Sequence, residues 1–359
     1  MLKSRKNYVF GAVLLFVLFF LTYRFMFSEV KFSEVLKDIQ GASTGWILAG
    51  AGAAVLYVVC ESCIIWYMLQ VLKQKTGFIS CLKYSFIGCF FSYITPSSSG
   101  GQPAQMYYMK KDGIKIGSSA LIMVLITIAY KSVLLIFGIF FFLFGHEIIF
   151  KQTEDIFWLM VSGAVLNTAF ISFLMMTLIK PGTVRRVGIS IVTFLYNKHL
   201  IKKKNHISVT DKINRICNNY SMSARYLHHN RRHMIIVFLI TALERSCLFS
   251  VTWIVYRSYG FNAVSFADII ALQTAIAIAV EMLPLPGAAG ITEGCFFVVF
   301  ESIFTAALVR PALLISRGLS FYLILILGGI ITLTTNIYGL ISQKNEKSQK
   351  NVSINKIRR

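Results

Sequence analysis

Two glycine-rich stretches interrupt apolar sequence and could bind an anion. The first break, PSSSGGQPAQ, runs from Pro96 to Gln105, and the second break, LPLPGAAGITEG, runs from Leu283 to Gly294. Glycine lets backbone approach a ligand closely, and a helix that begins after each break directs unpaired N–H groups toward it. The anion available in a bilayer is a lipid phosphate, so both breaks are predicted to receive a lipid head group.

The residues predicted to bind the head group are small or polar and lie inside the two breaks. In the first break they are Ser99, Gly100, Gly101, Gln102, Pro103 and Gln105, and in the second Pro286, Gly287, Gly290, Glu293 and Gly294. Pro103 suits the first turn of a new helix. Each break therefore has the composition of a loop that leads into a helix.

Charged side chains inside apolar runs form the second group of candidate residues. They are Glu61, Lys131, Glu244, Arg245, Glu281 and Arg317. Each costs roughly 2.5 to 3.5 kcal/mol on insertion scales if it lies at the membrane centre, so each is expected to have a partner or to line a pathway. Glu244 and Arg245 are adjacent and point toward different partners, but the sequence does not assign the pairs.

The sequence lacks the residue groups that an enzyme's active site would need. No histidine lies in an apolar run, no acidic pair has metal-ligand spacing, and no GxxxxGK[ST] phosphate loop occurs. The CxxC pair Cys60 and Cys63 is predicted to be structural. We expect no catalysis, no cofactor and no metal site.

Composition indicates an integral membrane protein. Of the 359 residues, 56% are hydrophobic and only 14% are charged. The hydrophobic share exceeds the apolar content that a soluble core of this length needs. We predict an all-α polytopic protein of about six spans. The expected spans are Tyr8 to Phe27, Gly45 to Leu69, Ser118 to Phe144, Ile156 to Ile179, Met234 to Tyr256 and Ala312 to Ile341. Residues 28–44 fit a surface amphipathic helix or a polar loop.

The segments beside the breaks are too short to cross a bilayer. Tyr84 to Ile94 rises only about 16 Å as a helix, about half of the hydrocarbon core. We predict re-entrant hairpins at 84–109 and 269–308, one from each face, in an inverted-repeat arrangement. Segments 269–282 and 295–308 could instead be tilted spans.

The basic residues predict orientation. The formal net charge is +21, and the proposed inner segments hold 27 Lys or Arg against five in the outer ones. Twelve lie between Lys180 and Arg232, beside the single acid Asp211, and are expected to bind anionic lipid rather than nucleic acid. The predicted parts are a first half (1–180), a cytoplasmic linker (181–232), a second half (233–341) and a cytoplasmic tail (342–359). Both termini are expected in the cytoplasm and the protein in the cell (inner) membrane.

The two breaks resemble the GGxPxR and PxPGGxGxxEG motifs of the transmembrane family that includes the flippase half of the lysylphosphatidylglycerol synthases. They are about 185 residues apart around a basic linker, as in that family. The resemblance singles out Gly100, Gly101 and Pro103, and then Pro284, Pro286, Gly287, Gly290, Glu293 and Gly294. The sequence departs from these motifs at four positions. Relatives often have Glu and Arg at Gln102 and Gln105, and Gly and Arg at Ala288 and Thr292, so the departures remove charge from both breaks.

The resemblance implies a flippase-like transporter of an anionic phospholipid or lipid-linked precursor. The soluble aminoacyl-transfer domain of the synthases is expected to be missing, because about 18 polar residues follow the last predicted span. The alternatives are a non-transporting scaffold for an envelope-biosynthesis enzyme and the membrane part of a lipid-linked glycosyltransferase. Expected partners are anionic membrane lipids. The lipid, the energy source and the oligomeric state stay open.

Overall fold

The protein is built from α-helices. The computed structural model describes residues 40–95, 98–145, 147–179, 231–285, 287–288 and 290–338, with isolated residues between 182 and 217. No strand occurs in these residues, as predicted. The expected span 8–27, the segment 28–39, most of the linker and the tail lie outside the described residues.

Five helical segments are long and apolar enough to cross a membrane. They are 44–71, 116–144, 149–179, 232–258 and 291–338. They include α3 (Thr44–Val71), α6 (Ile116–Phe144), α8 (Phe157–Ile179) and α11 (Arg231–Ser258), whose bounds agree with the predicted spans to within three residues. The predicted last span falls in the second part of 291–338.

The first break connects two short helices that lie against each other, and we call this pair the first hairpin. α4 (Phe78–Tyr93) and α5 (Gly101–Lys111) rise about 24 Å and 16 Å, less than the roughly 30 Å hydrocarbon core. Lys83 Nζ lies 2.6 Å from Asp112 Oδ2, and the Tyr84 hydroxyl donates to the same oxygen. These contacts join the beginning of α4 to the end of α5, so the chain leaves the hairpin at the end where it entered.

The second break connects α12 (Phe266–Val280) to α13 (Ile291–Arg317), and α12 with 291–304 forms the second hairpin. Thr305 has φ 69° and ψ 154°, which interrupts α13. A helix then continues from the residues after Thr305, through the π-helical turn η2 (Gly318–Tyr322), to Tyr338. The final helix therefore starts earlier than the predicted residue Ala312.

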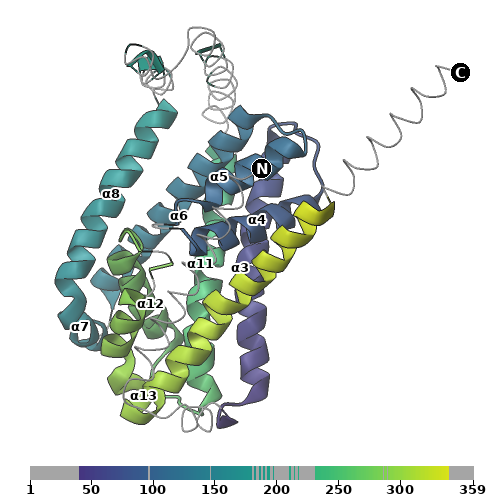
Figure 1. Cartoon of the computed structure of the whole chain (residues 1–359). Helices are drawn as coiled ribbons and strands as arrows, with labels where there is room; N and C mark the ends of the chain where they lie inside the picture. The colour runs from purple at the N-terminus through teal and green to yellow at the C-terminus, as the bar shows by residue number, and fades with distance from the viewer. Residues whose placement is uncertain are drawn as a thin grey trace, which may run out of the picture.

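Figure 1 shows the two hairpins toward opposite ends of the molecule. α3 and α11 pack along each other at the centre, α4 contacts α3, and α12 contacts α6, α8 and α11. Each hairpin has its own apolar core. Tyr84, Ile87 and Met109 belong to the core around the first, while Leu272, Phe296 and Phe300 belong to the core around the second.

The predicted outer loop between α6 and α8 contains a short helix. α7 (Glu147–Thr153) and the 3-10 turn η1 (Glu154–Ile156) turn the chain back into α8. Most large hydrophobic side chains of α8 are at the surface, whereas Gly163 and Asn167 are its buried residues. An apolar surface of this kind requires lipid rather than water around α8.

Candidate functional site

The tips of the two hairpins meet beside the π-turn η2. The Tyr93 ring at the end of α4 stacks on Phe321 with centroids 4.5 Å apart, and its hydroxyl donates to the Ser320 carbonyl at 3.3 Å. A Cβ built on Gly287 would lie 2.5 Å from the Phe321 ring and 3.4 Å from the Tyr93 carbonyl oxygen. The end of α4 and the loop that contains Gly287, which are far apart in sequence, thus lie beside the same region. This region is between the two ends of the molecule.

The first break presents serines at the surface and a glycine toward its partner helix. Ser98 and Ser99 are exposed, and so is Pro103 in the first turn of α5. Gly100 is the N-cap, and its N–H donates to Thr95 Oγ1 at 2.8 Å. Gly101 faces α4, where a Cβ would collide with the Ser92 side chain and lie 2.6 Å from the Gly88 carbonyl oxygen. Gly101 therefore permits close packing of α4 and α5.

The two glutamines of the first break bind neighbouring helices. Gln102 donates to the Thr127 hydroxyl on α6. Gln105, which is 2% exposed, donates to Glu61 Oε1 on α3 at 2.6 Å. These hydrogen bonds hold α5 against both helices and give Glu61 a neutral partner rather than a basic one.

The second break is organised by Glu293. Gly290, with φ +86°, is the N-cap of α13, and its N–H donates to Glu293 Oε2 at 2.6 Å. Glu293 Oε1 accepts a hydrogen bond from Arg317 Nε at 2.7 Å. The Arg317 guanidinium lies over the Phe321 ring at 5.2 Å, and its buried Nη2 has no hydrogen-bond partner among the described residues. Arg317 thus has one donor that its contacts with Glu293 and Phe321 do not use.

Two predicted glycines of the second break adjoin open space. A Cβ at Gly294, in the first turn of α13, would meet nothing within 4 Å, and the same is true of Gly290. Open space of this kind is what a ligand needs. Pro286 lies outside the described residues.

A cationic cluster marks the start of the second break. Glu281, the C-cap of α12, is 2.9 Å from Lys131 Nζ and 3.3 Å from Arg245 Nη1, and the Tyr130 hydroxyl donates to it. The Arg245 guanidinium also stacks on Tyr130, with Cζ 3.3 Å from the ring centroid. Two cations thus share the carboxylate of Glu281, and either could also contact a phosphate.

Glu244 is placed differently from its neighbour Arg245. It is 3% exposed, and its Oε2 has no hydrogen-bond partner in the part of the chain that the structure describes. No described Lys or Arg forms an ion pair with Glu244 or with Glu61. Glu244 and Arg245, which are adjacent on α11, thus lie in different surroundings.

The aromatic contacts of the site were not predicted. Tyr93 and Tyr130 neighbour a predicted residue or break in the sequence, and this adjacency is a signal that could have found them. Phe321 has no such signal, because its role depends on the π-turn that aims it at Tyr93. Among the described residues, no group of three or more His, Cys, Asp or Glu side chains could hold a metal ion.

Long apolar helices, two interior breaks and buried charges define a polytopic α-helical membrane protein. Residues 8–328 of the 359 match the lysylphosphatidylglycerol synthase TM region, and the chain belongs to this family. The comparison with curated proteins gave no match. The family is a membrane domain of the lysylphosphatidylglycerol synthase/flippase type, which is consistent with a lipid-related role in the membrane.

Proposed function

We propose that the protein moves an anionic phospholipid or lipid-linked precursor between membrane leaflets, with the head group passing between the two hairpin tips. The observation that carries this proposal is the meeting of the tips, where Gly287 lies beside Tyr93 and Phe321. One hairpin reaches this region from each end of the molecule (Figure 1). A re-entrant, inverted-repeat arrangement would place the region near the membrane midplane.

The polar chemistry around the tips supports passage of an anion. Irregular backbone at membrane depth is tolerated only where protein or a wet cavity surrounds it, because each unsatisfied group costs several kcal/mol in hydrocarbon. The exposed serines Ser98 and Ser99, the free donor of Arg317 and the Lys131–Arg245 cluster supply positive or donor groups. A phosphate could move among them while its acyl chains stay in lipid.

The basic residues at the open end of the first hairpin support its orientation. Lys83 lies near the start of α4, while Lys110 and Lys111 end α5 and Lys115 precedes α6. We place this end in the cytoplasm of a multi-pass cell-membrane protein, since basic residues are retained there. The second hairpin would then open outward.

The non-transporting scaffold remains the second candidate, because a specific observation favours it. Gly101, Gln102, Gln105 and Glu293 all have internal partners that stabilise the fold. A scaffold needs such packing and no open route. We favour transport because Ser99, Gly290 and Gly294 adjoin open space or the surface.

Reconstitution tests the proposal. Liposomes with the protein should expose a fluorescent phosphatidylglycerol or polyprenyl phosphate from the inner leaflet to an impermeant quencher faster than empty liposomes. Equal quenching rates across the anionic lipids tested would leave the scaffold as the better explanation.

A further inference from the structure

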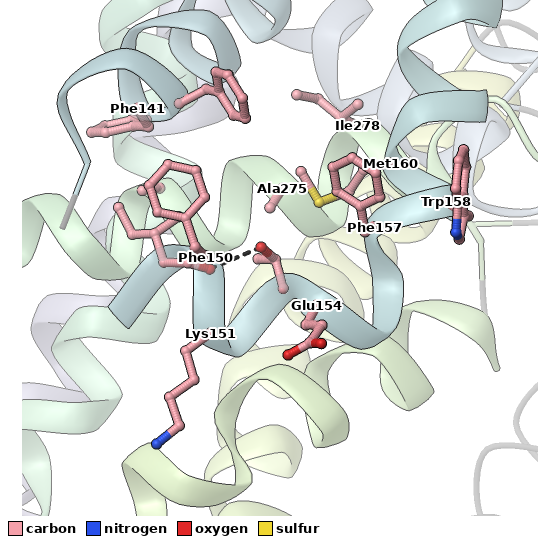
Figure 2. Close-up of a pocket in the computed structure, with 14 residues that line it drawn as sticks. Phe141, Phe150, Lys151, Glu154, Phe157, Trp158, Met160, Ala275 and Ile278 are labelled. Carbon is pink, nitrogen blue, oxygen red and sulfur yellow. Dashed lines mark hydrogen bonds between the residues drawn. The ribbon is translucent and has the colours of Figure 1, made fainter. Parts of the chain in front are cut away.

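A cavity of about 540 Å³ lies away from the hairpin tips, between α6, α7, α8 and α12. Figure 2 shows Phe141 and Phe150 on one side of it and Phe157, Met160 and Ile278 on the other. The volume lies within the range of small-molecule sites, and most of the lining side chains are apolar. The ligand that fits such walls is itself apolar.

The cavity exists because α12 presents small side chains to it. Ala271 and Ala275 are four residues apart and therefore lie on the same face of α12, with Ile278 one turn beyond Ala275. The phenylalanines of α6, α7 and α8 stand around this face without filling it. Larger residues at the two alanines would fill it.

The cavity opens where the protein surface is apolar. Its lining residues Phe142, Phe150 and Phe157 are 60%, 45% and 44% exposed, and Trp158 is 79% exposed. Trp is typical of the boundary between hydrocarbon and head groups, and the exposed Lys151 and Glu154 stand at the same rim. The rim therefore lies at head-group level, and the apolar interior lies next to hydrocarbon.

We propose that this cavity is a binding site for one acyl chain of a phospholipid, with the phosphate near Lys151. The lysine ammonium is a compact charge that suits a phosphate, and Figure 2 shows the Lys151 side chain extending away from the aromatic walls. In the orientation proposed above, this is a lipid of the outer leaflet. The site does not depend on translocation, since a resident lipid would be retained by a scaffold as well.

Native mass spectrometry of the purified protein tests the site. The protein extracted from membranes in mild detergent should retain one phospholipid per chain. Ala275→Phe, which places a ring in the cavity, should lower the retained fraction at least about tenfold, the factor that corresponds to about 1.4 kcal/mol. The matched control is Leu166→Phe on α8, because Leu166 is exposed and does not line the cavity. It should retain the lipid.

Lys151→Gln tests the head-group contact. With phosphatidylglycerol supplied in the detergent, retention should fall about fivefold, which corresponds to about 1 kcal/mol for one lysine at a membrane surface. Retention of a zwitterionic lipid should change less. An equal change for both lipids would overturn the placement of the phosphate.

A second measurement needs no substitution in the cavity. Phosphatidylglycerol with a diazirine in one acyl chain should label Phe150, Phe157 and Ile278 after irradiation in liposomes. Leu48 and Leu239, which are at least as exposed but lie elsewhere, should be labelled less. Uniform labelling, retention of a detergent instead of a phospholipid, or equal retention by wild type and Ala275→Phe would each overturn the proposal. Loss of translocation with the lipid retained would contradict only the proposed function.

Discussion

Tyr93 and Phe321 stack with their ring centroids 4.5 Å apart and thereby join the end of α4 to the π-turn after Arg317. The two residues come from opposite halves of the chain. Gly287 of the second break lies against both, so this contact places the second break beside the end of α4 that leads into the first break. π-turns inside long helices frequently occur at functional sites.

Gly287→Ala should therefore disturb both breaks at once. Gly287 has φ +56°, where a non-glycine residue costs roughly 1–2 kcal/mol, and the added methyl group would collide with Phe321. We expect a lower thermal unfolding midpoint in detergent. Gly318→Ala is the control, because its Cβ meets nothing within 4 Å in the adjacent π-turn. Equal midpoints for the two variants would contradict the close contact.

Glu281 and Glu244 should differ sharply when neutralised. Glu281→Gln leaves Lys131 and Arg245 without their carboxylate, and breaking a buried pair in this way costs about 3–5 kcal/mol. Glu244→Gln removes a charge that has no basic partner in the described part of the chain, so stability should stay the same or rise. Thermal unfolding of the two purified variants checks the order. A larger loss for Glu244→Gln would refute the assigned pairs.

The Glu293–Arg317 pair links the second break to the final helix. Arg317→Ala should cost several kcal/mol, because it leaves a Glu293 side chain of 3% exposure ionised and unpaired. Adding Glu293→Gln to Arg317→Ala should restore part of this loss. The measurement is a double-mutant cycle on unfolding midpoints, and strict additivity of the two single effects would show that the residues do not interact.

Much of the fold follows from local sequence. Apolar length predicts α3, α6, α8 and α11, and glycine and proline predict both breaks, because each of these signals lies within the segment itself. The first hairpin was predicted to start at residue 84, whereas α4 begins at Phe78. Apolar residues precede Lys83, and this lysine does not end the helix.

The site was less predictable, because its contacts join distant residues. Lys131 and Glu281 are 150 residues apart, and nothing in either segment selects the other. Thr305 interrupts α13 with a left-handed conformation that glycine favours and threonine does not. The cavity escaped prediction because α7 lies in what reads as a polar outer loop.

Thiol labelling tests the topology. In a cysteine-depleted background, Lys83→Cys and Lys111→Cys should both be shielded from an impermeant reagent added outside cells, since the Lys83–Asp112 contact joins the two ends of the first hairpin. Glu154→Cys, in η1, should be labelled. Labelling of only one of the two lysine positions would show that the chain crosses the membrane once between them. It would then not return to the side from which it entered.

The most direct measurement of head-group passage compares two glycines that both have open space around them. Gly294 is the last residue of the second break and lies in the first turn of α13, whereas Gly52 lies on the exposed side of α3. Valine has a higher helix propensity than the glycine that it replaces at either position, so both variants should fold. In liposomes, Gly294→Val should slow exposure of fluorescent phosphatidylglycerol at least about tenfold, equivalent to about 1.4 kcal/mol of barrier, while Gly52→Val should match wild type. Equal rates for Gly294→Val, Gly52→Val and wild type would contradict passage of the head group between the hairpin tips.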